Sequence, residues 1–266
     1  WMIVPLLMTI YFSVVRYNLM KPGDKDFIGL ANFEFFFTDP DFGASVWNTL
    51  LLLGSVIAIT VVLGVALALL VNETFPGRGL VRVLLISPFF VMPTATALLW
   101  KHMMMNPVYG VLSQVAIFFG MAPVDWLTDH PLFSVIVMVA WQWLPFACLI
   151  FITSLQSLDR DQMEAAGMDG ANAFQKFWFL TLPHLGRPIA VVVMIDLFFH
   201  DTASTEIYTT TSGGPGNAST NVAFLIFKQA LLNFDVGVAS AGALFAVVLA
   251  NIAAVFLIRM IGKNLD

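Results

Sequence analysis

The chain has 266 residues, of which 59% are hydrophobic and only 11% are charged, and its mean hydropathy is +0.87. Soluble domains carry about 25% charged residues, so this composition predicts an integral membrane protein. The formal net charge of -5 comes without a basic run that would neutralise phosphates, and we therefore expect no nucleic-acid partner. The single cysteine, Cys148, excludes a disulfide framework and a cysteine-based metal site.

The chain begins at Trp1 and enters an apolar run at once. Residues 1–20 lack the basic segment and the small-residue cleavage site of a signal peptide. We therefore expect residues 1–18 to be a membrane span, preceded in the native protein by a short cytoplasmic lead.

Six segments are long and apolar enough to cross a bilayer or nearly so, since a spanning helix needs about 20 mainly apolar residues. They are residues 1–18, 47–71, 81–101, 131–154, 189–211 and 236–260. We expect one all-α, polytopic domain over residues 1–266, with about six transmembrane helices. Because Lys and Arg are slightly enriched in the turn at 72–82, in residues 155–188 and in the tail, these parts are expected to face the cytoplasm.

Several residues within the spans have predictable structural effects. Pro88 and Pro93 in the third span and Pro145 in the fourth remove backbone donors, so these helices should kink. Small residues such as Gly64 in the second span should let a neighbouring helix approach closely. Trp100, like Trp47 and Trp126, is expected in an interfacial aromatic belt.

Residues 159–188, DRDQMEAAGMDGANAFQKFWFLTLPHLGRP, form a charged segment between the fourth and fifth spans. Asp159 followed by Gln162 predicts a helix N-cap with a capping-box partner. Gly170 can take the positive φ of a tight turn, and residues 171–182 predict a second amphipathic helix that ends at Pro183. The result is a cytoplasmic helix-turn-helix, on which residues 164–166, Glu-Ala-Ala, offer a small face to another protein.

The fifth span is unusually polar, because Asp196, His200, Asp201 and Glu206 lie in or beside the membrane. A central acid costs about 2.5 to 3.5 kcal/mol on insertion scales. This span must therefore be shielded by other helices or line a wet cavity. Asp196 and His200 are four residues apart and lie on one helical face, where they can pair. The residues fit either a polar wall of a solute pathway or a buried structural pair followed by an early helix exit near His200.

A spaced pattern in the charged segment resembles the EAA loop of permease subunits of binding-protein-dependent ATP-binding cassette importers. It consists of Glu164-Ala165-Ala166, three residues, Gly170, nine residues, Leu180, one residue, and Leu182-Pro183. Leu180 stands where the family usually has isoleucine. GLANFEFFF, PGRGLVRVLLISPFFVMP, ALLWKHMMMNPVYGVLSQ and TTTSGGPGNASTN are similar to the carbohydrate branch of these permeases, and most similar to those for polyols such as mannitol and sorbitol.

The resemblance implies a multi-pass protein of the bacterial cytoplasmic membrane that pairs with a second, homologous permease. Residues 155–188, here termed the coupling loop, would contact an ATPase subunit. The coupling residues that it implies are Glu164, Ala165, Ala166, Gly170, Leu182 and Pro183. Gly213-Gly214-Pro215 resembles the outward loop that meets an extracytoplasmic solute-binding protein. Because the chain has no phosphate-binding G-x-x-x-x-G-K-[ST] motif, ATP and Mg²⁺ would belong to the partner ATPase, and we expect no bound cofactor and no enzymatic activity here.

A carbohydrate or polyol pathway would need hydroxyl-directed polar groups and aromatic faces. The candidate pathway residues are Asp196, His200, Asp201, Glu206, Tyr208, Asn251, Trp141 and Trp143. The two tryptophans fit core packing as well, and Asn251 fits a hydrogen bond between helices. Residues 200–205 are more polar than the family pattern. The four histidines lack the ligand spacing of a metal site.

Two other classes of protein fit parts of the sequence. A proton-coupled secondary transporter would use Asp196, His200 and Asp201 as a relay. Such transporters usually contain an internal repeat, which is not visible here, and they have no need of a coupling loop. A membrane enzyme is disfavoured because no catalytic constellation is recognisable.

Overall fold

The computed structural model describes residues 3–21, 23–200 and 204–262. Within these ranges the chain is mainly helical and has no β-strand beyond two isolated bridges, Val15 with Phe27 and Asn18 with Asp235. The helices, with 3₁₀ or π segments marked η, are α1 (Ile3–Ser13), α2 (Ala31–Thr38), α3 (Phe42–Asn72), α4 (Arg78–Ile86), η1 (Ser87–Phe90), α5 (Pro93–Leu99), η2 (Trp100–Met104), α6 (Val111–Phe118), α7 (Trp126–Asp129), α8 (Pro131–Gln156), α9 (Arg160–Met168), α10 (Ala173–Lys176), η3 (Phe177–Thr181), α11 (Leu182–His184), α12 (Gly186–His200), α13 (Ser204–Thr210), α14 (Val222–Phe227), η4 (Lys228–Leu232) and α15 (Val236–Gly262).

The predicted spans correspond to helices of different kinds. In the described residues α3 and α8 are each long and apolar enough to cross a membrane, and two bent helix pairs raise the number to four. These pairs are Arg78–Phe90 with Pro93–Met104, bent by 106°, and Ala173–His184 with Gly186–Phe198, bent by 57°. Helix α1 has only 11 residues, so the first predicted span is shorter than residues 1–18. The described part of the fifth consists of α12 (Gly186–His200) and α13 (Ser204–Thr210).

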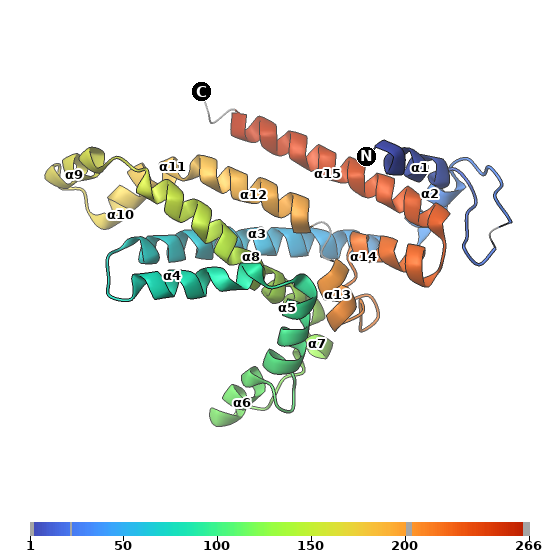
Figure 1. Ribbon diagram of the computed structural model, residues 1–266, viewed down its shortest axis with the longest axis horizontal. Coiled ribbons are helices and arrows are strands. Elements are labelled where there is room, and N and C mark those ends of the chain that lie inside the picture. Colours follow the sequence, from blue (N-terminus) through green and yellow to red (C-terminus); the bar gives the residue numbers. More distant parts are fainter. Residues whose placement is uncertain (1–2, 22, 201–203, 263–266) are drawn as a thin grey trace.

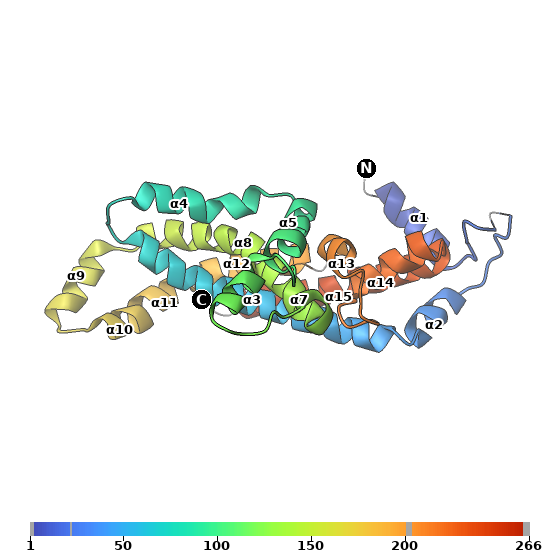
Figure 2. The same ribbon diagram turned by 90° about the horizontal axis from the view of Figure 1, so that it is seen from below.

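Helices α3 and α8 form the centre of the bundle and lie side by side along the long axis (Figures 1 and 2). Between them Phe151, which is fully buried, packs in an apolar cluster with Val65 and Ala68. A methyl group on Gly64 would lie 3.0 Å from the Phe151 ring. Gly64 therefore permits the close approach of the two helices, as predicted from the small residues of this span.

The third span bends sharply at its prolines. It breaks between η1 and α5, after Pro88 and directly before Pro93, where the two halves meet at 106°. Gln142 on α8 donates a hydrogen bond of 2.7 Å to the Val91 carbonyl oxygen at this break, which satisfies an acceptor that the helix no longer uses. Beyond the bend, α5, η2 and α6 leave the axis of the bundle (Figure 1). By contrast, α8 continues through Pro145 as one helix.

The two polar regions of the chain lie at opposite ends of the bundle. Helices α9 and α10 of the coupling loop extend beyond one end of α3 and α8, while α2 and α14 lie near the other (Figures 1 and 2). The coupling loop is therefore distant from α13 and from the loop that follows it (Figure 1).

Candidate functional sites at the two ends of the bundle

The coupling loop is built from two short helices joined at a glycine. The Asp159 side chain caps α9 by accepting a 2.9 Å hydrogen bond from the Asp161 N–H, so the predicted N-cap is confirmed. The capping box is not at Gln162. It is formed on α10, where the side chains and backbone amides of Asn172 and Gln175 bond reciprocally. Gly170 has a φ of +80°, which confirms the tight turn predicted there.

The second helix of the loop does not end at Pro183, as the sequence predicted, but continues to His184. Residues Phe177–Thr181 form a π turn, in which the Leu182 N–H bonds the Phe177 carbonyl. Pro183 follows this π turn directly, at the second residue of α11, where the hydrogen-bond pattern of the helix has already changed. The chain bends by 57° only after this point, between His184 and Gly186.

The residues expected to contact an ATPase are mostly on the surface. Glu164, Ala165, Gly170 and Pro183 are exposed, and Ala166 and Leu182 are half-buried. Large apolar side chains near these residues are also exposed, namely Met168, Phe174, Trp178 and Phe179. A groove of 310 Å³ lies between the two helices, lined by Ala166, Gly170, Phe179, Leu180 and neighbouring residues. An exposed apolar surface of this kind outside the spans is typical of an interaction site.

Asp196 lies in the interior of the bundle. Its side chain on α12 is 1% exposed and its Oδ2 accepts a 2.6 Å hydrogen bond from Oγ1 of Thr60 on α3. This bond offsets part of the cost of burying a polar group. The predicted helix exit near His200 stays a prediction, because residues 201–203 lie outside the described residues. Asp201 lies outside the described residues, and so does the side chain of His200.

The other pathway candidates are not gathered in one place. Glu206 on α13 is 6% exposed. Tyr208 is 52% exposed and its ring packs at a tilt against Phe227, 5.1 Å between centroids. Asn251 is exposed, and its Nδ2 donates to the Val247 carbonyl of its own helix. Among the described residues, the hydrogen bond of the Asn251 side chain therefore stays within its own helix.

Trp141 and Trp143 are half-buried and take part in aromatic packing. Trp141 meets Trp100 edge to face, 5.8 Å between ring centroids, and Trp143 meets Phe89 in the same way at 5.7 Å. Trp100 is only 8% exposed and belongs to an apolar cluster with Met105. In this cluster Trp100 packs with Met138 and Trp141 of α8, and its place in an interfacial belt stays a prediction.

Three polar groups that the sequence analysis did not select stand out in this region. Thr96 Oγ1, Trp100 Nε1 and Gln142 Oε1 are buried and have no hydrogen-bond partner among the described residues. All three lie in the part of the structure where α5 and η2 pack on α8. Buried polar atoms nearly always have a hydrogen-bond partner. These three atoms could therefore bond to a molecule that enters this part of the spans. The only signal in the sequence is a glutamine within an apolar span.

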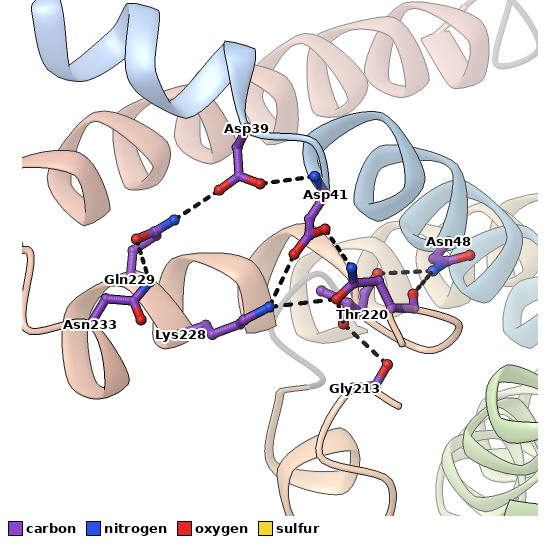
Figure 3. A network of polar contacts seen from close by, with 9 residues as sticks. Asp39, Asp41, Asn48, Gly213, Thr220, Lys228, Gln229 and Asn233 are labelled. Atoms are coloured by element: carbon purple, nitrogen blue, oxygen red, sulfur yellow. Dashed lines mark hydrogen bonds and ion pairs between the residues drawn. The ribbon is translucent and has the colours of Figure 1, made fainter. Parts of the chain in front are cut away.

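At the other end of the bundle, a polar network fixes the loop that carries Gly213 (Figure 3). The Asp41 carboxylate, just before α3, accepts hydrogen bonds from Asn217 Nδ2 and from Lys228 Nζ, the latter at 3.0 Å. Asn48 Nδ2 donates to the carbonyl oxygens of Asn217 and Thr220, each at 3.0 Å. The loop is therefore held against the start of α3 and η4.

Gly213, Gly214 and Pro215, which the sequence analysis assigned to contact with a solute-binding protein, differ in exposure. Gly213 is buried, Gly214 is half-buried and Pro215 is exposed. Gly213 has a φ of +85°, and its carbonyl oxygen accepts a 3.2 Å hydrogen bond from Thr220 Oγ1. A methyl group on Gly213 would lie 2.5 Å from Thr220 Oγ1 and 2.8 Å from the Phe224 ring. Gly213 thus shapes the loop, while Pro215 is available on its surface.

Comparison with known proteins relates this geometry to a family. The binding-protein-dependent transport system inner membrane components match residues 61–266. The probable ABC transporter permease protein y4oQ of Sinorhizobium fredii is 36% identical over 236 residues, 88% of this chain and 76% of that protein. The trehalose/maltose transport system permease protein MalF of Thermococcus litoralis is 31% identical over 252 residues, 94% and 84% of the two chains.

Solved structures agree with these relatives at the level of the fold. A chain of a bacterial alginate ABC transporter, in complex with an alginate pentasaccharide-bound periplasmic protein, superposes with a TM-score of 0.79. The match covers 97% of this chain and 86% of that chain at 23% identity. Because the family match covers most of the chain and relatives above 30% identity span nearly all of it, this protein belongs to the binding-protein-dependent transport system inner membrane components, the permease subunits of ABC transporters.

Proposed function

We propose that this chain is a permease subunit of an ATP-driven importer for carbohydrates or polyols in the bacterial cytoplasmic membrane. It would form half of the translocation pathway together with a second, homologous permease. Support comes from relatives named for trehalose and maltose, for multiple sugars in Streptococcus mutans, and for sn-glycerol-3-phosphate in Agrobacterium fabrum. The polyol preference rests only on the sequence similarity described above.

Energy would enter through the coupling loop. The observation that carries this proposal is the exposed, uncovered surface around Glu164, Ala165 and Ala166 at the end of the bundle. ATP would be hydrolysed by a separate ATPase subunit that binds this surface. Leu182 and Pro183 lie in the return leg of the loop, where they would pass the movement to α12.

An extracytoplasmic solute-binding protein is the remaining partner. The alginate transporter was solved with such a protein bound. In this chain the exposed side of the loop around Pro215 would be its contact, because the polar network around Asp41 already holds that loop in place.

Within the spans, we assign solute contact to the region where α5 and η2 pack on α8. The unpaired atoms of Thr96 and Gln142 and the rings of Trp141 and Trp143 supply the donors, acceptors and aromatic faces that sugar hydroxyls and ring faces require. Asp196 and Glu206, both buried, would shape the electrostatics of the same half. A proton relay through Asp196 is not favoured, because its carboxylate is already hydrogen-bonded to Thr60 inside the bundle.

Charge reversal at the coupling loop tests the proposal. Glu164→Lys should insert into the membrane normally but lose the co-purifying ATPase and all ATP-dependent uptake. Glu73→Lys is the matched control, since Glu73 is also exposed and follows α3 at the same end of the bundle. Full ATPase binding and uptake by Glu164→Lys, or equal losses in both variants, would refute the coupling assignment.

The solute can be identified separately. Maltose, trehalose, mannitol and sorbitol would be screened for the thermal stabilisation that each produces in the cognate binding protein, and for uptake by cells that carry the importer. Stabilisation and uptake confined to mannitol and sorbitol would support the polyol assignment. A response to the disaccharides alone would contradict it while leaving the carbohydrate assignment intact.

A further inference from the structure

His184 bridges the two legs by which the coupling loop is attached to the bundle. Its Nε2 lies 2.9 Å from the Ser154 carbonyl oxygen and 3.3 Å from Ser157 Oγ. Ser154 is in the last turn of α8, Ser157 caps that helix, and His184 is the last residue of α11. One side chain thus joins the point where the chain leaves the bundle to the point where it returns.

The chemistry of this contact assigns the proton. A carbonyl oxygen only accepts hydrogen bonds, so Nε2 of His184 carries the hydrogen that it donates to Ser154. Ser157 Oγ donates to the same carbonyl at 2.8 Å and is free to accept from Nε2. The last carbonyls of an α-helix lack donors within the helix, and a donor at that end also interacts favourably with the helix dipole. The Ser154 carbonyl also accepts from the Ser157 backbone N–H at 3.0 Å, so His184 adds a donor that comes from the other end of the coupling loop.

An apolar contact lies directly beneath this hydrogen bond. Leu185 is fully buried in the cluster that contains Leu155 and Phe151 of α8. Farther out, the described residues of α9 are exposed or half-buried, and Figure 1 shows α9 and α10 extending past the end of the bundle. The coupling loop is therefore attached at its base, where His184 and Leu185 contact α8 and Phe177 packs against the same apolar cluster.

We propose that His184 is a positioning residue that ties α8 to the start of α12, so that a displacement of the coupling loop moves both helices together. The inference rests on the proposed function, in which an ATPase displaces this loop. If the end of α8 and α11 could separate freely, a displacement of the coupling loop would move only one of them. Because His184 joins them, the displacement moves α8 and α12 together. Packed side chains and hydrogen-bond networks of this kind carry energetic coupling between distant sites.

Two substitutions of one position separate the hydrogen bond from the imidazole ring. The side-chain amide nitrogen of glutamine reaches about as far from Cα as Nε2 of histidine, whereas that of asparagine stops near Nδ1. His184→Gln can therefore keep the donor to Ser154, and His184→Asn cannot. Both variants remove the ring and leave Leu185 in the core, so their difference reports the bridge.

The first measurement is the spread of distances between spin labels, on the assembled importer in lipid nanodiscs. One label replaces Gln162 on α9, which is exposed, and the other replaces Thr74 in the exposed turn between α3 and α4. The native Cys148 is buried. We expect a broader distance distribution in His184→Asn and the wild-type width in His184→Gln. Equal widths in all three proteins would overturn the proposal.

The second measurement is solute imported per ATP hydrolysed, in proteoliposomes with saturating binding protein. We expect the ATPase to co-purify with every variant. The solute imported per ATP hydrolysed should fall about fivefold in His184→Asn only, a change of the size found when residues along coupling networks are mutated. An unchanged ratio in His184→Asn would overturn the bridge. Failure of any ATPase to bind the wild-type chain would instead reject the proposed docking, and the label distances would still decide on His184.

Discussion

Replacing Gly213 by alanine should distort the loop that it shapes, and the size of the effect follows from two separate causes. An L-residue in the left-handed region costs roughly 1–2 kcal/mol, and Gly213 has a φ of +85°. The new methyl group would also lie 2.5 Å from Thr220 Oγ1 and 2.8 Å from the Phe224 ring, both of which are buried. Overpacking of this kind costs about 1–3 kcal/mol, and loss of the Thr220 hydrogen bond about 0.5–1.5 kcal/mol more.

Gly216→Ala is the matched control for Gly213→Ala. Gly216 lies in the same loop with a φ of +61°, but nothing lies within 4 Å of an added methyl group there. It should therefore lose only the roughly 1–2 kcal/mol of backbone strain. We expect Gly213→Ala to lower the free energy of unfolding by about 2–4 kcal/mol more than the control, because only its methyl group meets buried atoms.

The assay is denaturant unfolding in detergent micelles, combined with digestion of residues 211–221 by a protease of broad specificity. Thr220→Ala removes the nearest clashing atom, so the double variant with Gly213→Ala should be more stable than additivity predicts. Equal destabilisation by Gly213→Ala and Gly216→Ala, together with additivity in the double variant, would refute this account of the loop.

Three further predictions concern the coupling loop, the fifth span and the polar network. Gly170→Asp should abolish uptake and ATPase co-purification, whereas Gly120→Asp, at another left-handed glycine with open space around it, should retain both; equal behaviour would contradict the docking surface. Asp196→Asn keeps an oxygen to accept from Thr60, so assembly should persist while the uptake rate or substrate preference changes, and unchanged uptake would leave Asp196 a purely structural role. Lys228→Met removes the cation beside Asp41, which should lower the free energy of unfolding by about 1–3 kcal/mol, between the values for surface and buried pairs. Proteolysis of residues 211–221 should then be faster than in the wild type, and an unchanged rate would contradict this role of Lys228.

Some features of the fold could be read from short stretches of sequence, because local chemistry alone decides them. The apolar runs of α3 and α8, the N-cap Asp159 and the positive φ of Gly170 all follow from residue types at neighbouring positions. The break of the third span at Pro88 and Pro93 is of the same kind, since a missing backbone donor acts on its own helix.

Other predictions failed or stayed open because they depended on contacts between distant segments. Trp100 is buried in a cluster with Met138 of α8, beyond a bend of 106°, and no local pattern encodes the size of that bend. The helix passed through Pro183 because a π turn preceded it. Asp196, a candidate for the pathway, lies next to Thr60, 136 residues away in the chain.

Composition, residue spacing and capping act over a few residues, so they were enough to predict a polytopic, helical membrane protein with a charged coupling loop. The contact of His184 with α8, the burial of Gly213 beside Thr220 and Phe224, and the bonds of Asp41 with Asn217 and Lys228 became visible only in the folded chain. These contacts link residues far apart in the chain, and the packing of helices, not any local preference, sets which of them meet.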